Sequence, residues 1–481
     1  MAPAVVAIVG AGFSGSLLAL HLLGAGRYAP KILLFERASG FGKGVAYATG
    51  NPSHLLNVRA ANMSAFPDRP DHFLDWLRRQ PGMEAAGPAS FVPRATYGAY
   101  LQDMLTQAVR QPEAAGRLVL VPDDAAALRR QADGLVLTAG VGRDYRVDAC
   151  VLAIGNLPPE TPAVGDWAFY SSPRFHADPW QPGMIAEIGR QDRVLLIGTG
   201  LTMVDVVLAL QAQGHRGRVH ALSRRGLLPR RHPAGATHAV PSAPALPGAL
   251  SDALHTVRAA IRAEVAASRD WQPVIDSLRP WTRSLWQGLD TGAKARFLRH
   301  LRPWWDVHRH RLSPPVADRI QAMQAAGLLQ VTAGRLRHMA DTGAAARISW
   351  LPRGSERIEE QEVDHVINCA GPGCDLRRAR DPLVQDLLAS GLVRPDPLHL
   401  GLDVSTAGQV ISAAGQAVEG VYAIGPVTRG AFWEITAVPD IRVQARDLAR
   451  MLLTQRTTQT AGAPQPTAAG REAAGSAHDS Q

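Results

Sequence analysis

The sequence predicts an α/β fold that contains two similar strand–glycine turn–helix–strand units and a helical insertion. The first unit is VVAIVGAGFSGSLLALHLL followed by KILLFE, and the second is RVLLIGTGLTMVDVVLALQ followed by RVHALSRR. In both units a short apolar run enters a glycine turn, and apolar residues at helical spacing follow. The next stretch lacks this alternation, is rich in tryptophan, and predicts helices near 249–268, 272–288, 291–301 and 315–326. This order is typical of two Rossmann-like dinucleotide-binding domains with a helical insertion.

The first unit has the residues that a bound dinucleotide requires. Gly10 allows a tight turn, Gly12 lets a pyrophosphate approach the backbone, and Gly15 lets the helix pack closely on the strand. The helix N-terminus offers free N–H groups to the phosphates, and Glu36 can accept hydrogen bonds from a ribose. The predicted cofactor contacts of this unit are Gly10, Gly12, Phe13, Ser14, Gly15, Glu36 and Arg37.

The second unit repeats the plan with two changes. Met203 replaces the third glycine, which allows a less close approach of helix and strand. Arg224 lies 26 residues after Gly198, the same interval that separates Glu36 from Gly10. A carboxylate suits a free 2′-hydroxyl and an arginine suits a 2′-phosphate, so the first unit predicts FAD and the second NADPH. The predicted contacts here are Gly198, Gly200, Leu201, Thr202, Ser223, Arg224 and Arg225.

Two further stretches are predicted to face a flavin ring. One is the polar loop after the second strand, which leaves the strand end where parallel sheets bind ligands; it offers Asn57, Asn62 and Met63. Asparagine is also common in turns for local reasons, so that alternative stays open. The other is YAIGPVTRGAFWEITAVPDIR, where a strand enters a third glycine turn. Its predicted contacts are Gly425, Trp433 and Glu434, with simple packing of Trp433 against a helix as the alternative.

The order of these stretches predicts the domain organisation. The predicted parts are an FAD-binding domain (1–160 and 365–454), an NADPH-binding domain (183–240 and 321–364), a helical insertion (241–320) and a disordered tail (455–481). Two strands of the same plan, VDACVLAIGN and VDHVINCAGPG, begin at Asp148 and Asp364. We interpret them as paired crossings between the two nucleotide domains. Before the first of them, GLVLTAG and DYRV predict a hairpin or meander.

Charge and composition limit the classes of function. The chain has 481 residues and a formal charge of +9. Because the basic residues are scattered over a folded-looking chain, we expect anionic cofactors and an anionic or amine small-molecule substrate as partners, not nucleic acid; part of the basic residues is simply solvated. No uncharged apolar run of about 18 residues is present, which predicts no membrane span. We therefore expect a cytoplasmic protein.

The remaining chemistry-bearing residues give weaker signals. Cys369 and Cys374 have the spacing of the redox pair of some flavin reductases, but they follow a strand far downstream of the first glycine turn. Buried or loop thiols are the favoured interpretation. The HRHR run at 308–311 has no acidic partner pattern, so we expect no metal site. No triad or acid–base pair is evident, and the catalytic residues stay unassigned.

With these motifs, the chain resembles flavoproteins with two dinucleotide-binding domains, such as flavin-containing and N-hydroxylating monooxygenases, and in particular a group of bacterial FAD/NAD(P)-binding proteins. The stretches that carry the resemblance are VGAGFSG, GKGVAYATGNPSHLLNVRAANMSAFPDRPDHFLDWL, IGTGLTMVDV, SRRGLLPRRH and YAIGPVTRGAFWEITAVPDIRVQA. The resemblance implies N-hydroxylation of small amino acids by some relatives. Glutathione reductase-like enzymes usually have Gly-Asp in the last turn; here it is Gly425-Pro426, which disfavours that branch.

Motifs and resemblance together predict an FAD-dependent, NADPH-using oxidoreductase. The leading hypothesis is a monooxygenase that oxidises a small molecule, such as an amine, with molecular oxygen through a flavin hydroperoxide. One alternative is an NADPH-dependent flavin dehydrogenase or reductase without oxygen insertion. The other is a non-catalytic nucleotide-binding redox sensor.

Overall fold

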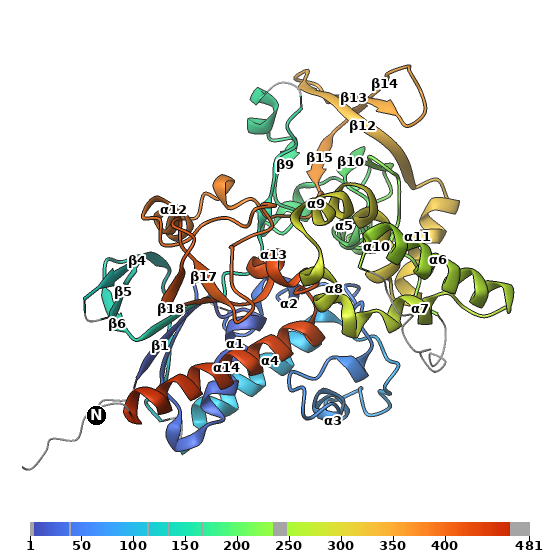
Figure 1. Cartoon of the computed structure of the whole chain (residues 1–481). Helices are drawn as coiled ribbons and strands as arrows, with labels where there is room; N and C mark the ends of the chain where they lie inside the picture. Colours follow the sequence, from blue (N-terminus) through green and yellow to red (C-terminus); the bar gives the residue numbers. More distant parts are fainter. Residues whose placement is uncertain are drawn as a thin grey trace, which may run out of the picture.

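The computed structural model describes residues 4–37, 40–112, 115–132, 134–164, 167–233 and 248–461, with side chains as far as residue 454. Figure 1 shows two β-sheets with helices packed on them. We call the six-stranded sheet with its helices the first unit, and the seven-stranded sheet with its helices the second unit. The predicted α/β fold with parallel sheets is confirmed.

The first unit has a mostly parallel sheet. Its strands, in spatial order, are β17 (Gln409–Ile411), β18 (Ala417–Ala423), β7 (Ala149–Leu152), β1 (Val5–Val9), β2 (Lys31–Phe35) and β3 (Leu118–Val121). The antiparallel strand β17 forms one edge. Helix α1 (Phe13–Leu23) packs against α4 (Arg94–Arg110) and α14 (Val438–Ala461), and the three lie side by side in Figure 1. Because helices cover the sheet, β1, β2 and β7 consist almost entirely of buried apolar residues.

Smaller elements surround this sheet. The predicted pairing of GLVLTAG and DYRV is confirmed by β5 (Gly134–Ala139) and β6 (Asp144–Val147), and β4 (Ala125–Gln131), which was not predicted, makes this antiparallel sheet a three-stranded meander. The short helices of this unit are α2 (Gly44–Tyr47), α3 (His72–Arg78), α12 (Pro382–Ala389) and α13 (Arg429–Phe432). Of these, α12 packs on β4, and α13 directly follows the third glycine turn.

The second unit is a mixed sheet. Its strands, in spatial order, are β14 (Glu359–Val363), β13 (Ala346–Pro352), β12 (Leu329–Asp341), β11 (Val219–Ser223), β10 (Val194–Ile197), β15 (His365–Asn368) and β9 (Phe175–His176). The part from β12 to β9 is parallel, whereas β13 and β14 extend it as antiparallel strands. Helix α5 (Leu201–Ala212) connects β10 to β11, and α11 (Pro314–Ala325) leads into β12.

The predicted counterparts Asp148 and Asp364 have the same position in both units. Asp148 accepts a hydrogen bond from the backbone N–H of Val5 at 2.6 Å, and Asp364 accepts one from the N–H of Arg193 at 2.7 Å. Each aspartate also donates its own N–H to the carbonyl of the same partner. The chain crosses between the units at β8 (Leu157–Pro159) and β16 (Pro372–Gly373), which pair antiparallel. The two crossings are therefore paired, but β15 (His365–Asn368) lies in the second sheet, so the crossing comes after it and not at the predicted boundary of 365.

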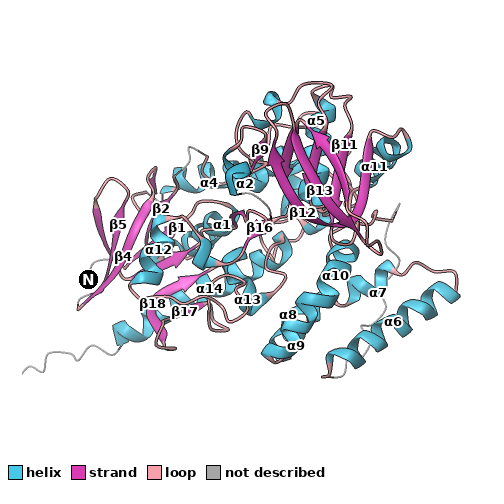
Figure 2. Ribbon diagram, turned by 90° about the horizontal axis from the view of Figure 1, so that it is seen from above, coloured by secondary structure: helices cyan, strands magenta, loops and turns pink. Residues whose placement is uncertain are grey.

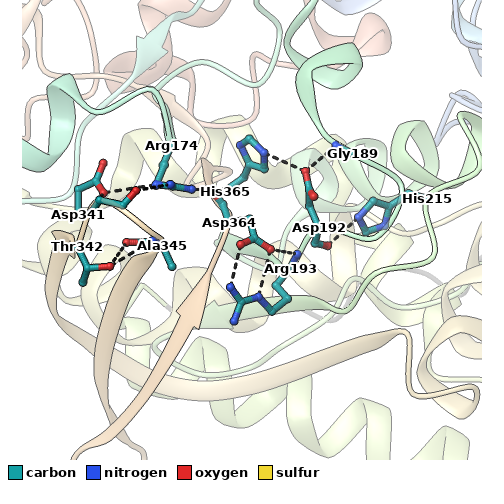
Figure 3. A network of polar contacts seen from close by, with 11 residues as sticks. Arg174, Gly189, Asp192, Arg193, His215, Asp341, Thr342, Ala345, Asp364 and His365 are labelled. Carbon is teal, nitrogen blue, oxygen red and sulfur yellow. Dashed lines mark hydrogen bonds and ion pairs between the residues drawn. The ribbon is translucent and has the colours of Figure 1, made fainter.

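A polar network joins the chain before β10, which includes Arg174 and Asp192, to strands β12 and β15 of the second sheet (Figure 3). His365 Nε2 lies 3.1 Å from Asp192 Oδ2, and His215 Nε2 lies 3.0 Å from the Asp192 carbonyl oxygen. Arg174, in the crossing segment, lies 3.4 Å from Asp341 at the end of β12. These contacts connect the segment before β10 with β15 and β12, so they fix where the chain enters the second unit.

A helical segment lies beside the second sheet (Figure 2). It consists of α6 (Leu250–Ala266), α7 (Gln272–Ser277), α8 (Thr282–Gly288), α9 (Thr291–Arg296) and α10 (Arg302–Arg309). The helix predicted over 272–288 is two helices, because a 3₁₀ turn at Arg279–Trp281 contains Pro280, which has no N–H to donate. All residues of α6 are at least partly exposed.

The C-terminal helix α14 is longer than expected. It continues to Ala461, so residues 455–461 of the predicted disordered tail have a helical backbone; 462–481 lie outside the described residues. Among the helices of the described residues, none combines the length and apolar character needed to cross a bilayer.

Candidate functional site

Both glycine turns of the nucleotide motifs open into one cavity between the two units. Its volume is about 2980 Å³, several times the ~300–1,000 Å³ of a pocket for one small ligand. The carboxyl ends of β1, β2, β10 and β11 line it, as expected for a ligand crevice in parallel α/β sheets. The cavity therefore has room for two nucleotides and a small substrate.

The first glycine turn has the geometry that its sequence predicts. Gly10 has φ of +101°, and a Cβ atom on it would lie 2.5 Å from the carbonyl oxygen of Ala153. A Cβ on Gly15 would lie 2.0 Å from the carbonyl oxygen of Gly10, so only glycine lets α1 approach β1 this closely. Gly12 faces the Cα of Gly44 and lines the cavity. The turn leaves space for a pyrophosphate at the N-terminus of α1.

The second glycine turn is built similarly. Gly198 has φ of +116°, and a Cβ on it would lie 2.4 Å from the carbonyl oxygen of Cys369. A Cβ on Gly200 would meet no atom within 4 Å, and this open space belongs to the cavity. Met203, at the position of the missing third glycine, is a fully buried residue of α5. The backbone around Gly200 thus fits a pyrophosphate.

The residues at the ends of β2 and β11 also face the cavity. Glu36 Oε2 accepts a hydrogen bond from the N–H of Ala11 at 3.0 Å. The Ser223 hydroxyl accepts one from the N–H of Gly226 at 3.0 Å, which shapes the turn that carries Arg224 and Arg225. The two predicted ribose-end residues, Glu36 and Arg224, therefore lie at equivalent strand ends of the two sheets.

Sequence reasoning missed two arginines beside Arg224. Arg335 on β12 and Arg353 after β13 line the same cavity. Ser223 pairs with Ala333 in the parallel register, and the N–H of Arg353 bonds the carbonyl of Ala333, so both arginines come next to the end of β11. No carboxylate of the described ranges lies within ion-pair distance of these arginines. Only the sheet pairing, not local spacing, could have revealed them.

Most of the predicted cofactor contacts lie at the cavity wall. The predicted residues that line it are Gly10, Gly12, Phe13, Ser14, Glu36, Arg37, Asn57, Asn62, Met63, Gly198, Gly200, Leu201, Thr202, Ser223, Arg224, Arg225 and Glu434. Gly15 and Gly425 lie behind this wall. A Cβ on Gly425 would lie 2.3 Å from the Ser14 hydroxyl oxygen, so Gly425 lets the third turn approach α1.

Trp433 does not line the cavity, contrary to the expected ring contact. It has φ of +42° and is 2% exposed, and its ring stacks on Trp286 with 4.8 Å between centroids. The positive φ turns its side chain into an aromatic cluster with the helical segment, which is the packing alternative. The neighbouring Glu434 does face the cavity and accepts hydrogen bonds from Trp305 Nε1 at 2.7 Å and Arg309 Nε at 3.1 Å.

A buried ion pair connects the two units at the cavity. Arg94 at the start of α4 donates two hydrogen bonds, of 2.8 and 3.1 Å, to Asp205 of α5. His54 Nε2 lies 2.9 Å from the carbonyl oxygen of Asp205. Burial raises the pKa of Asp205, and Arg94 opposes this shift. Arg94 therefore has a protein carboxylate as its partner, not a phosphate.

The cysteines are placed as the favoured interpretation predicts. Burial in β7 raises the pKa of Cys150 to about 12, and burial next to Gly198 raises the pKa of Cys369 further above its usual value. Cys374 is partly exposed. In the HRHR run, burial lowers the pKa of His310 to about 4, and His308 Nδ1 contacts the Trp304 carbonyl. The part of the chain that the structure describes contains no group of three or more metal-ligating side chains.

The comparisons with known proteins agree with this geometry. Residues 7–157 match the FAD-NAD(P)-binding family. Ornithine N-hydroxylase of Kutzneria sp. 744 has a similar structure, with a TM-score of 0.63, 14% identity, and 95% of this chain and 100% of that chain covered. L-lysine 6-monooxygenase of Pseudomonas syringae has a TM-score of 0.63 and 15% identity, with 94% of this chain and 99% of that chain covered. Thioredoxin reductase of T. acidophilum has a TM-score of 0.52 and 12% identity, with 94% of this chain and 98% of that chain covered. A comparison with curated protein sequences gave no match.

These results define the class of protein. At these identities the structural likeness shows a shared fold, that of Rossmann-type flavoproteins. The match over residues 7–157 shows an FAD/NAD(P)-binding domain, which confirms the predicted cofactor class.

Proposed function

We propose that this protein is an NADPH-using, FAD-dependent monooxygenase that oxygenates a small molecule, with N-hydroxylation of an amine as the specific reaction. The observation that carries the proposal is the cavity that both glycine turns share, which α10 lines on the side of the third turn. Its volume of about 2980 Å³ is several times that of a pocket for one small ligand, and Glu434 and the polar loop with Asn57 and Asn62 both line it, so we place the substrate between them.

The protein's own residues bind and orient the reactants. The turns at Gly12 and Gly200 would hold the two pyrophosphates, Glu36 the FAD ribose, and Arg224 the 2′-phosphate of NADPH. FAD, when bound, supplies hydride acceptance and reactivity towards oxygen. Trp305 and Arg309 of α10 anchor Glu434, so the helical segment covers the substrate space and limits the entry of water.

The cysteine positions support oxygenation over disulfide reduction. Of the predicted candidate pair, Cys369 is buried under the second glycine turn, so its thiol has no access to a disulfide substrate. Cys374 alone is partly exposed, and a single thiol does not form the intramolecular redox disulfide of such reductases. The higher TM-scores of the two amino-acid monooxygenases point in the same direction.

The test is the reaction of the reduced flavin with oxygen. The FAD-loaded protein is reduced with NADPH without oxygen and then mixed with aerated buffer in a stopped-flow spectrophotometer. We expect a species that persists between the reduced and oxidised spectra, and the Cys374→Ser variant to behave like the wild type. Direct return to the oxidised spectrum, with fast oxygen-insensitive turnover of a quinone, would instead show a dehydrogenase or reductase. Flavin that NADPH never reduces would indicate a non-catalytic sensor.

A further inference from the structure

The cavity wall made by the helical segment, α13 and the start of α14 contains more arginines than carboxylates. Three of its arginines have a carboxylate partner: Arg279 with Asp440 at 2.7 Å, Arg302 with Asp306 at 3.3 Å, and Arg309 with Glu434 at 3.1 Å. Two more, Arg429 and Arg442, line the same cavity. Within the described residues, no carboxylate lies within ion-pair distance of either of these two.

Arg429 is held in place by an aromatic ring. Its guanidinium carbon lies 4.6 Å from the centroid of the Trp433 ring, and the thiol of Cys374 lies beside it. Its Nε is buried and has no hydrogen-bond partner among the described residues. Burial, and then the nearby Arg302, lower the pKa of Arg429, while Cys374 and Asp306 oppose this shift.

Arg442, in the first turns of α14, also lines the cavity and also has a buried Nε that is unpartnered among the described residues. Its Nη1 donates to the carbonyl oxygen of Ser64 at 2.9 Å, while its Nε is buried and unpartnered in the part of the chain that is described. Ser64 follows the predicted flavin contacts Asn62 and Met63, so Arg442 faces the part of the cavity assigned to the flavin ring. Burial lowers the pKa of Arg442 and Arg279 nearby adds to this shift, while Tyr97 and Asp440 oppose it.

The Nε donors of Arg429 and Arg442 are buried and unpartnered among the described residues, and a buried donor is costly unless an acceptor joins it. The planar guanidinium fork suits a carboxylate or a phosphate. We propose that Arg429 and Arg442 form a subsite that binds an oxyanion group, a carboxylate or a phosphate, of the substrate. This inference rests on the proposed function and specifies the substrate as a small anion.

The same excess of positive charge favours the proposed reaction. An amine is nucleophilic only in its neutral form, and nearby cations disfavour its protonated form. A substrate whose oxyanion is held by these arginines would bring its neutral nitrogen into a region where the charged form is unfavourable.

The test is binding of small anions to protein loaded with FAD and NADP⁺, so that the nucleotide phosphate sites are already filled. Isothermal titration calorimetry with succinate and, separately, with inorganic phosphate distinguishes the two oxyanions. We expect one of them to bind, and Arg429→Gln and Arg442→Gln each to weaken that binding about 10- to 100-fold. Arg442→Lys, which keeps the charge, should lose less.

Two matched arginines serve as controls. Arg446 lies one turn beyond Arg442 on α14 and pairs with Asp447, and Arg283 on α8 is exposed and donates to the Thr406 carbonyl. Neither lines the cavity, so Arg446→Gln and Arg283→Gln should bind as the wild type does. If wild type binds neither anion, or if the glutamine variants at 429 and 442 bind unchanged, the inference is wrong. Flavin reduction by NADPH, measured in wild type without succinate, tests the proposed function separately.

Discussion

The two units have glycine turns of the same backbone geometry but differ in the side chains around them. At Gly10 and Gly198 the chain turns with positive φ beneath a neighbouring carbonyl, and Asp148 and Asp364 fix the starts of the two first strands in the same way. They differ after the turn. Gly15 allows van der Waals contact of helix and strand in the first unit, whereas a buried methionine fills that place in the second.

The second difference lies at the ribose end. At the end of β2 the cavity is lined by Glu36, with Asp123 and Asp124 after the neighbouring strand β3, while Arg224 stands among further arginines that β12 and the segment after β13 contribute. We infer from this comparison that the backbone sets where a pyrophosphate would lie, and that side chains from the neighbouring strands would select the nucleotide. The following variants test this division, from the largest expected effect to the smallest.

The largest effect should come from the contact that joins the units. Asp205→Ala leaves the largely buried Arg94 without a carboxylate partner, which should lower the free energy of unfolding by about 3–5 kcal/mol. Denaturant unfolding followed by circular dichroism measures it. The control is Asp318→Asn, which breaks the exposed pair with Arg231 on the surface of the second unit and should cost about 0–1 kcal/mol. Equal losses would mean that the units do not depend on this contact.

Substitution by alanine should distinguish Gly15, which has a structural role, from Gly200, which faces the ligand. Gly15→Ala places Cβ against the Gly10 carbonyl and should destabilise the first unit by about 3 kcal/mol. Gly200→Ala places Cβ in open space, so the protein should unfold like the wild type but bind NADPH more weakly. Thermal unfolding and nucleotide titration report the two effects. A normally stable Gly15→Ala protein would contradict the close packing of α1.

The methionine in the second unit should be a packing residue. Met203→Ala removes a fully buried side chain and should cost about 2–3 kcal/mol of unfolding free energy because a cavity remains. Met203→Leu, of similar volume, is the control and should cost less than about 1.5 kcal/mol. The same denaturant experiment measures both. If alanine is tolerated as well as leucine, the helix has moved in to fill the gap.

The smallest effect concerns nucleotide choice. Arg224→Ala or Arg353→Ala should raise the Kd for NADPH about tenfold, ~1.4 kcal/mol, and leave the Kd for NADH nearly unchanged, because only the 2′-phosphate loses a partner. Glu36→Gln, in the other unit, should not alter this ratio. If Arg353→Ala also leaves the ratio unchanged, Arg224 and Arg225 alone select the nucleotide.

Local backbone rules made much of the fold predictable. The glycine turns, the helices after them and the equivalence of Glu36 and Arg224 follow from interactions within about 30 residues, where spacing determines geometry. Asp148 and Asp364 were recognisable because each heads a strand with the same pattern. These features depend on steric limits that apply wherever such a sequence occurs.

The rest of the site depends on tertiary pairing. Asp205 lies 111 residues from Arg94, and Arg353 comes to the second nucleotide site only through the register of three strands. No spacing within the sequence expresses these contacts. Trp433 was misplaced for another reason: its positive φ, which sequence alone does not reveal for tryptophan, turns the ring away from the cavity.

Helix α10 carries two consecutive tryptophans with different neighbours. The Trp304 ring lies 6.0 Å from the guanidinium carbon of Arg225 in the second unit, while Trp305 Nε1 donates to Glu434 near the third glycine turn. Successive helical residues point about 100° apart, so the two indoles sample separate environments. The protein thus has one tryptophan that can report by its fluorescence on each side of the cavity. Replacing either tryptophan by phenylalanine would show whether a change in emission comes from nucleotide binding or from substrate binding.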